Sequence, residues 1–150
     1  MRIIVQRVRE AQVTSEGKLL AKQAAGFLLL LGIADGDSDQ DITWLVNKIA
    51  KIRLFADDEG KMNLSLLDTG GDVTVVSQFT LQASYRKGNR PSFLAAAHPS
   101  IAEPLYEKFC AQLSETLDRP VSQGRFGADM QINLINDGPV TLLLDSRNPE

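Results

Sequence analysis

An uninterrupted apolar run at residues 27–33, FLLLLGI, constrains the fold of this chain more than any other feature. A short run of this kind is typical of a β-strand that is buried on both faces. A chain of 150 residues with 43% hydrophobic content can supply the necessary core within one domain. The run therefore predicts a single domain built around a central buried strand.

The composition places the chain among soluble proteins of a reducing compartment. No window is apolar over the length of a membrane-spanning helix, and the first residues meet charge too early for a signal peptide. The single cysteine, Cys110, excludes an intramolecular disulfide. We therefore expect a cytoplasmic protein. Its net charge of −3 disfavours a tight, nonspecific nucleic-acid binder but leaves room for a catalyst that touches one end of an RNA.

Other segments with the composition of short strands recur along the chain, at residues 2–8, 11–14, 18–21, 64–67, 73–80, 130–135 and 140–144. Ser15-Glu16-Gly17 separates the second and third of these, and Asn136-Asp137-Gly138-Pro139 separates the last two. Both spacers have turn chemistry. They predict two β-hairpins.

Two segments have the spacing of an amphipathic helix. Ser38 is a candidate N-cap, with Asp41 three residues on, for a helix whose apolar face spans residues 42–52. The second helix is expected at residues 100–117. Together with the strands, the helices predict an α+β fold. We expect one domain over residues 1–150, with a mostly antiparallel, partly barrel-like sheet, two main helices and a frayed tail at 146–150.

Several kinds of chemistry are excluded by what the sequence lacks. There is one histidine, His98, and one cysteine, so no cluster has the spacing of a zinc or iron–sulfur site. Nothing near a serine or near Cys110 resembles a nucleophile elbow, and no phosphate-cradling glycine loop is present. We expect His98 to cap a helix or lie on the surface, and Cys110 to pack in the core. We expect no metal or other cofactor. If the chain is an enzyme, its catalytic power must come from backbone donors or from the substrate.

Two polar motifs remain, SQFTL at residues 77–81 and NDGPVT at residues 136–141. The first closes an apolar strand with four residues, Ser77, Gln78, Phe79 and Thr80. A strand end beside a loop can leave backbone N–H groups without ladder partners, and such groups can bind a developing oxyanion. The same residues also fit a strand end whose hydroxyl groups cap a turn, and the second motif also fits a plain hairpin.

Together the two motifs resemble the signatures of the D-aminoacyl-tRNA deacylase family, SQFTL and NxGPVT, both without substitution. Similar family residues are found in four further segments, Gln6-Arg7-Val8, Gly60-Lys61-Met62-Asn63-Leu64, Arg90-Pro91-Ser92-Phe93 and Ala128-Asp129-Met130. The resemblance thus covers nearly the whole chain. It implies an enzyme that hydrolyses the ester at the 3′ end of an aminoacyl-tRNA.

The resemblance also implies a homodimer in which the Gly-Pro pair of one subunit enters the active site of the other. Gly138 and Pro139 would face residues 77–80 of the partner chain. The neighbouring substrate-binding residues would be Asn136, Val140 and Thr141. The Gly-Pro bond is implied to be cis, although only about 5–6% of X–Pro bonds are cis in folded proteins. Backbone carbonyls at this corner would exclude an L side chain, whereas a D-amino acid or glycine would fit.

For catalysis, we assign the oxyanion role to backbone N–H groups around Phe79 and Thr80. The 2′-hydroxyl of the terminal ribose can position or activate the attacking water. Thr80 is either a nucleophile or a group that orients this water, and with no base identifiable nearby we favour orientation.

Two sets of cations complete the expected site. Arg7 is expected to support the Gly-Pro geometry, because a related branch that tolerates some L-amino acids lacks this arginine. Arg86, Lys87 and Arg90 form a local basic cluster that is a candidate contact to acceptor-end phosphates, or else a solvated loop.

Two other functions stay open. One is the broader deacylase of that related branch, which acts on L-alanine attached to the wrong tRNA. The other is a noncatalytic dimeric module that binds RNA or a small ligand, which would suit the lack of conventional catalytic side chains. The two intact motifs argue against the module.

Overall fold

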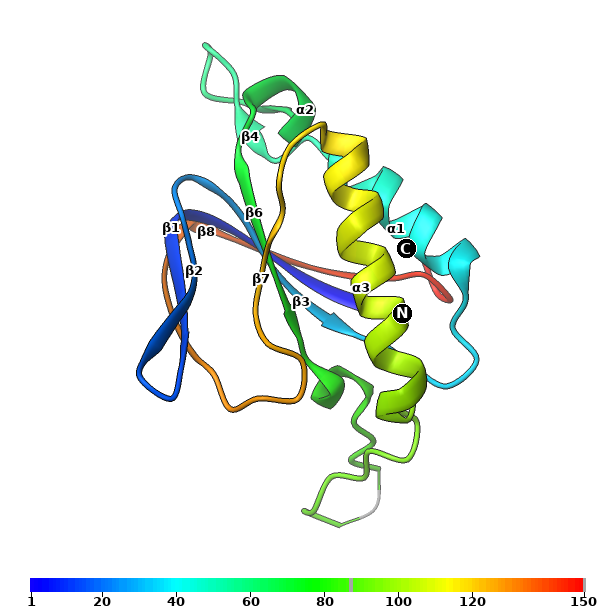
Figure 1. Cartoon of the computed structure of the whole chain (residues 1–150). Coiled ribbons are helices and arrows are strands. Elements are labelled where there is room, and N and C mark those ends of the chain that lie inside the picture. Colours follow the sequence, from blue (N-terminus) through cyan, green and yellow to red (C-terminus); the bar gives the residue numbers. More distant parts are fainter. Residues whose placement is uncertain (87, 150) are drawn as a thin grey trace.

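The structure is a computed structural model and describes residues 1–86 and 88–149 (Figure 1). The elements follow one another as β1 (Arg2–Ser15), β2 (Lys18–Gln23), β3 (Gly26–Gly32), α1 (Asp39–Lys51), β4 (Phe55–Ala56), β5 (Met62–Leu64), α2 (Leu66–Thr69), β6 (Asp72–Ser77), the 3₁₀-helix η1 (Phe79–Gln82), α3 (Pro99–Leu117), β7 (Ser122–Gln123) and β8 (Gln131–Asp145). They confirm the expected single α+β domain with two main helices.

Strand β1 organises the main sheet. It pairs antiparallel with β2, β3 and β8, and β3 then pairs in parallel with β6, which pairs in parallel with β7. The sheet is therefore antiparallel around β1 and parallel around β6. The parallel pair brings the end of β6 beside the end of β3, where Ser77 is opposite Leu31.

The apolar run forms β3 and is buried on both faces, as its sequence predicted. Phe27, Leu28, Leu29 and Leu31 are each at most 1% exposed. Phe27, Leu29 and Leu31 point into the main core, which α1 and α3 cover, whereas Leu28 points into a second cluster on the opposite face of the sheet. Because successive side chains of a strand point to opposite faces of the sheet, β3 contributes residues to both cores.

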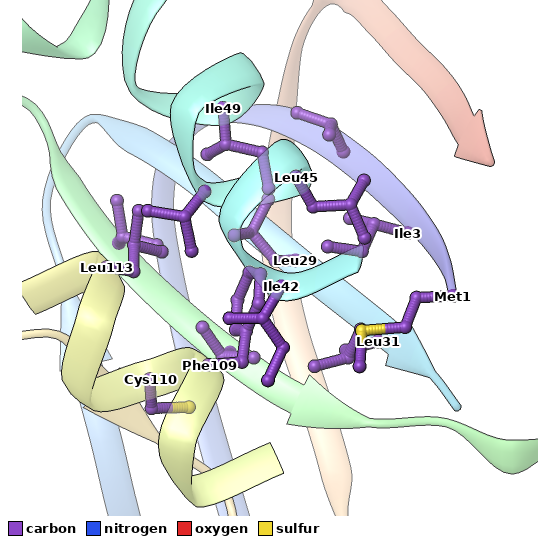
Figure 2. Close-up of a cluster of buried hydrophobic side chains, with 14 of the residues drawn as sticks. Met1, Ile3, Leu29, Leu31, Ile42, Leu45, Ile49, Phe109, Cys110 and Leu113 are labelled. Carbon is purple, nitrogen blue, oxygen red and sulfur yellow. The ribbon is translucent and has the colours of Figure 1, made fainter. Parts of the chain in front are cut away.

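The two helices pack side by side over one face of the sheet (Figure 1). Figure 2 shows Ile42, Leu45 and Ile49 of α1 and Phe109 of α3 meeting the strand residues between them. The N-terminus of α1 carries the expected capping contact, since the Asp41 carboxylate accepts a hydrogen bond of 2.8 Å from the Ser38 backbone N–H.

The second cluster explains the partly barrel-like shape. Met130, Ile132 and Leu134, at the beginning of β8 and just before it, pack against a group that contains Leu28 of β3 and Val76 of β6. Strand β8 is hydrogen-bonded to β1 and not to these strands. Its first half therefore curls around the sheet to cover the face that the helices leave open.

Three local predictions are wrong. Residues 2–8 and 11–14 belong to one strand, β1, and residues 64–67 are divided between β5 and helix α2. Residues 130–135 and 140–144 are not the arms of a hairpin, because both pair with β1 within the single strand β8. Partner residues in β1 thus override the turn chemistry of residues 136–139.

The end of the chain is better fixed than the expected fraying of residues 146–150 suggests. The Ser146 backbone N–H donates to the Met1 carbonyl at 2.9 Å. The Arg147 guanidinium lies 2.8 Å from the Asp37 carboxylate and donates to the Asp35 carbonyl at 2.6 Å. The chain is tied to the domain as far as Arg147.

None of the helices in the described part of the chain is both long and apolar enough to cross a bilayer.

Candidate active site

The SQFTL motif folds as the end of β6 followed by a tight turn. Ser77 is the last residue of β6, Gln78 caps the 3₁₀-helix η1, and Phe79 and Thr80 are its first two residues. The Gln78 backbone N–H donates to the Leu31 carbonyl at 2.8 Å, and its side-chain amide donates to the Thr80 hydroxyl. The sequence prediction extended the strand through Thr80, whereas the strand ends three residues earlier, at Ser77.

The turn presents two backbone N–H groups that the helix itself cannot pair. The first residues of a 3₁₀-helix have no carbonyl one turn before them. Among residues 1–86 and 88–149, no hydrogen bond to the amide of Phe79 or Thr80 is found. Both side chains are exposed, and Phe79 is 58% accessible. The structure thus provides the free donors that the strand-end hypothesis required.

The turn is held from below by the end of β3. A Cβ at Gly32 would lie 2.8 Å from the Gln78 carbonyl oxygen, so only glycine allows the turn to approach this closely. The buried Gln82 side chain donates to the Gly32 carbonyl at 2.8 Å. Sequence reasoning did not identify Gln82, because a buried glutamine is recognisable only when its partner is known.

Arg2 ties the same turn to the end of β8. Its Nη1 donates to the Leu81 carbonyl at 3.0 Å, and its Nε donates to the Asp145 carboxylate at 2.8 Å. Burial raises the pKa of Asp145, but hydrogen bonds from Arg2 and the Arg147 backbone outweigh it and leave the pKa lowered. Asp145 is therefore ionised at neutral pH and holds the Arg2 guanidinium in place.

An open, largely apolar pocket of about 730 Å³ lies beside the turn. Ser77, Gln78 and Phe79 line it, together with Phe93 and the segment 126–130. The Phe79 and Phe93 rings make an edge-to-face contact with centroids 5.1 Å apart. Three segments noted in the sequence, SQFTL, RPSF and ADM, therefore meet at one pocket. Its size suits a small ligand.

The pocket also contains two titratable side chains that sequence reasoning did not nominate, His98 and Asp129. His98 caps α3, as expected, because its Nδ1 accepts a hydrogen bond from the Ser100 backbone N–H at 3.3 Å. Asp129 lies next to Met130 on the pocket wall. The residues around His98 give no indication in the sequence that its side chain shares a pocket with residues 77–79.

The single cysteine is confirmed as a core residue. Cys110 is buried on α3, and burial raises the pKa of its thiol to about 12. At neutral pH it is therefore a protonated, inert thiol. In the described part of the chain no group of histidine, cysteine and carboxylate side chains has the arrangement of a metal site.

The second motif forms a bulge in the middle of β8. Gln6 of β1 pairs with Thr141 and Val8 pairs with Asn136, so residues 137–140 stand out of the ladder. The Gly138–Pro139 bond is cis, as the family resemblance implied, and both residues are exposed. Asn136 and Thr141 close the base of the bulge with a side-chain hydrogen bond of 3.2 Å.

The Arg7 side chain lies against this corner. Its Nε is 3.1 Å from the Asp137 carboxylate, and the guanidinium also donates to the Leu54 carbonyl. Arg9 pairs with the same carboxylate at 3.0 Å. A Cβ at Gly138 would lie 2.9 Å from Arg7 Nη2 and 3.0 Å from Val140 Cγ2. Arg7 and Val140 therefore fit against a glycine, whose φ of +113° is also disfavoured for other residues.

Within one chain the two motifs do not meet. Ser77 pairs with Leu31 of β3, which pairs with Ile3 of β1. The bulge is opposite Arg7, four residues further along β1, and β8 lies on the edge of β1 that faces away from β3. The rise and spacing of β-strands place them roughly 20 Å apart. A site that uses both motifs must therefore take them from two copies of the chain.

The basic cluster lies in the loop between η1 and α3. Arg86 and Arg90 are exposed, and Lys87 is outside the described residues. Ser84 and Ser92 pair across this loop through two backbone hydrogen bonds of 2.8 Å.

The sequence matches the family model described as "D-Tyr-tRNA(Tyr) deacylase" over residues 4–145. The chain belongs to this family. Its relatives include D-aminoacyl-tRNA deacylases of Parabacteroides distasonis, with 52% identity, and Chromobacterium violaceum, with 54% identity, each over 100% of both chains. The resemblance seen in the two motifs is thereby confirmed.

Solved structures agree with the deacylase family fold. A structure titled "c-Myc DNA Unwinding Element Binding Protein" superposes with a TM-score of 0.91 and 39% identity, over 97% of this chain and 98% of that one. A second, titled "Structural Analysis of a probable eukaryotic D-amino acid tRNA deacylase", has a TM-score of 0.81 and covers 95% and 97% of the two chains. At 18% identity it supports the fold alone.

Proposed function

We propose that this deacylase family member hydrolyses the ester of D-aminoacyl-tRNA to free tRNA and D-amino acid. The observation that carries the proposal is the pair of free amides, Phe79 and Thr80, beside an apolar pocket. Its relatives with 52% and 54% identity bear the name of that activity.

The chemistry needs few side chains. Water attacks the ester carbonyl carbon, and the Phe79 and Thr80 N–H groups donate to the oxygen as it becomes negative. The bond from carbon to the ribose oxygen then breaks, and this oxygen takes up a proton. The 2′-hydroxyl of the same ribose positions the water. Gln78 donates to the Thr80 oxygen, which leaves the Thr80 hydroxyl proton free to orient that water.

Handedness is sensed by the partner subunit in this proposal. The Gly138–Pro139 corner is exposed, stands out of the β8 ladder and is too far from the turn of its own chain to act there. In a homodimer it enters the partner's pocket and fills the space that an L side chain needs. Arg7 and Asp137 hold the corner in position.

The test is hydrolysis of D-tyrosyl-tRNA and L-tyrosyl-tRNA by the purified protein. We expect rapid loss of the D ester and no loss of the L ester beyond its spontaneous rate. L-alanine attached to a threonine acceptor, in the same assay, distinguishes the broader deacylase. Stability of all three esters would leave a noncatalytic binding module as the better description.

Glycyl-tRNA is expected to be hydrolysed as well. Exclusion by the corner is steric, and glycine has no side chain to exclude. The measurement is the rate on glycyl-tRNA at the enzyme concentration that clears D-tyrosyl-tRNA. Full resistance of glycyl-tRNA under those conditions would refute the steric account.

The side chains of Thr80, on the turn, and His98, in the pocket, are expected to be dispensable for the chemical step. Thr80→Ala and His98→Ala should each keep kcat within about tenfold of the wild type, because removing a true general base costs roughly 100- to 10,000-fold. Mass spectrometry of the quenched reaction should show no acyl group on Thr80. An acyl-Thr80 adduct, or a collapse of kcat in His98→Ala with an unchanged melting temperature, would overturn this assignment.

A further inference from the structure

A second cleft, of about 790 Å³, lies next to the pocket and has a different character. Leu94 lines both cavities, so they adjoin. The cleft contacts the catalytic turn directly, because Arg2 on its wall donates to the Leu81 carbonyl, one residue after Thr80. A ligand that extends from the pocket past Leu94 would therefore enter this cleft.

The cleft carries more positive than negative charge, on a chain whose net charge is −3. Three guanidinium groups line it, those of Arg2, Arg86 and Arg147, against the carboxylates of Asp35 and Asp145. The internal contacts of Arg2 use Nε and Nη1, and those of Arg147 use Nη2. Each guanidinium therefore has N–H groups left to donate.

Arg86 differs from the other two arginines. It is exposed, and the described part of the chain contains no ion pair that involves it. Its charge is therefore not cancelled within the protein. A guanidinium of this kind, beside two more, is suited to phosphate oxygens.

Large side chains without a partner also line the cleft. Tyr85 is 81% exposed and Leu94 is 94% exposed, although both belong to residue types that usually avoid water. Cations interleaved with an exposed aromatic ring are the features that bind single-stranded nucleic acid, since the ring stacks on a base while the cations meet the backbone.

We propose that this cleft binds the unpaired 3′ strand of tRNA immediately before the nucleotide that carries the ester. Arg86 and Arg147 contact its phosphates, and Tyr85 stacks on a base. This inference rests on the proposed function, because it takes the ester to lie at Phe79 and Thr80. It identifies contacts beyond the reacting end that the pocket itself does not provide.

The test compares two substrates of the intact protein, D-tyrosyl-tRNA and D-tyrosyl-adenosine, which lacks every backbone phosphate. The variants are Arg86→Ala and Tyr85→Ala, whose side chains are exposed and which should fold normally. Lys22→Ala is the matched control, because Lys22 is an exposed cation on β2, beside the far end of β1. Melting temperatures verify the fold of each variant.

We expect each cleft variant to raise KM for D-tyrosyl-tRNA by roughly three- to tenfold, with little change on D-tyrosyl-adenosine. In Arg86→Ala, the dependence of log KM on log salt should also become shallower by about 0.7 to 1. Lys22→Ala should match the wild type. The salt dependence is measured on tRNA alone, so it decides even if the adenosine ester is a poor substrate.

The possible results distinguish failure of the cleft proposal from failure of the proposed deacylase function. A wild-type protein that hydrolyses neither substrate contradicts the proposed function. An active wild type whose cleft variants behave like Lys22→Ala overturns the cleft proposal alone. Equal losses on both substrates would mean that these residues shape the pocket, and a changed oligomeric mass would assign the surface to protein contacts. Either result overturns the RNA assignment.

Discussion

Phe79→Pro is expected to lower kcat for D-tyrosyl-tRNA by roughly 100- to 1000-fold, the usual cost of removing one oxyanion donor. Proline deletes the Phe79 N–H, and the first position of a helical turn tolerates it because that N–H has no internal partner. Gln78 before it is not helical, with φ −145° and ψ 79°, so the usual clash before proline is avoided. Single-turnover kinetics measure the effect.

Phe79→Ala is the matched control. It removes the same ring, including its contact with Phe93, and keeps the backbone donor. We expect its kcat to remain within about tenfold of the wild type, so that the difference between the two variants isolates one N–H group. If both variants lose activity equally, the ring matters and the amide does not, and the oxyanion assignment is wrong.

Mixed dimers give the second large effect. Gly138→Val should abolish correct placement of the corner, because a β-branched residue at φ +113° is strained and its Cβ would crowd Arg7 and Val140. A heterodimer of one Phe79→Pro chain and one Gly138→Val chain, purified through two different tags, has one pocket in which both motifs are intact. We expect it to hydrolyse D-tyrosyl-tRNA at about half of the wild-type rate per dimer and to reject L-tyrosyl-tRNA, whereas the Phe79→Pro homodimer is nearly inactive and the Gly138→Val homodimer hydrolyses both esters.

A second heterodimer reverses the expectation. When both substitutions are on one chain and its partner is wild type, the one intact turn faces an altered corner, and we expect D-tyrosyl-tRNA and L-tyrosyl-tRNA both to be hydrolysed. If each chain instead used its own corner, this second heterodimer would reject L-tyrosyl-tRNA and the first would hydrolyse it. That pattern would contradict a cross-subunit site.

Local patterns predicted the parts of the fold that depend on neighbouring residues. The apolar run at residues 27–33 forms a strand whose side chains alternate between two buried faces, as an apolar run of this length predicts. Ser38 and Asp41 cap α1 through hydrogen bonds between residues only three positions apart. The bulge at residues 137–140 could not be predicted in this way. Its Asp137 carboxylate pairs with Arg7 and Arg9 of β1, more than 120 residues earlier, instead of closing its own turn.

The candidate site shows the same division. The SQFTL motif marked the turn to which we assign catalysis, because the motif and the turn occupy the same residues. Gln82, Arg2 and His98 were missed, because each acts on or beside the turn through a partner that only the tertiary fold supplies. Whether a main-chain amide is free cannot be predicted from residue type. The only indication in the sequence was that the SQFTL motif lies at the end of a strand.

The bulge in β8 has a consequence for how this enzyme can change. The ladder between β8 and β1 continues on both sides of residues 137–140, and within the bulge Gly138 and Pro139 are exposed. Changes at these two residues need not disturb the ladder, or the Phe79 and Thr80 amides, which lie beyond the end of another strand. In the proposed mechanism, the range of amino acids that are rejected can therefore diverge over evolutionary time separately from the groups that cleave the ester.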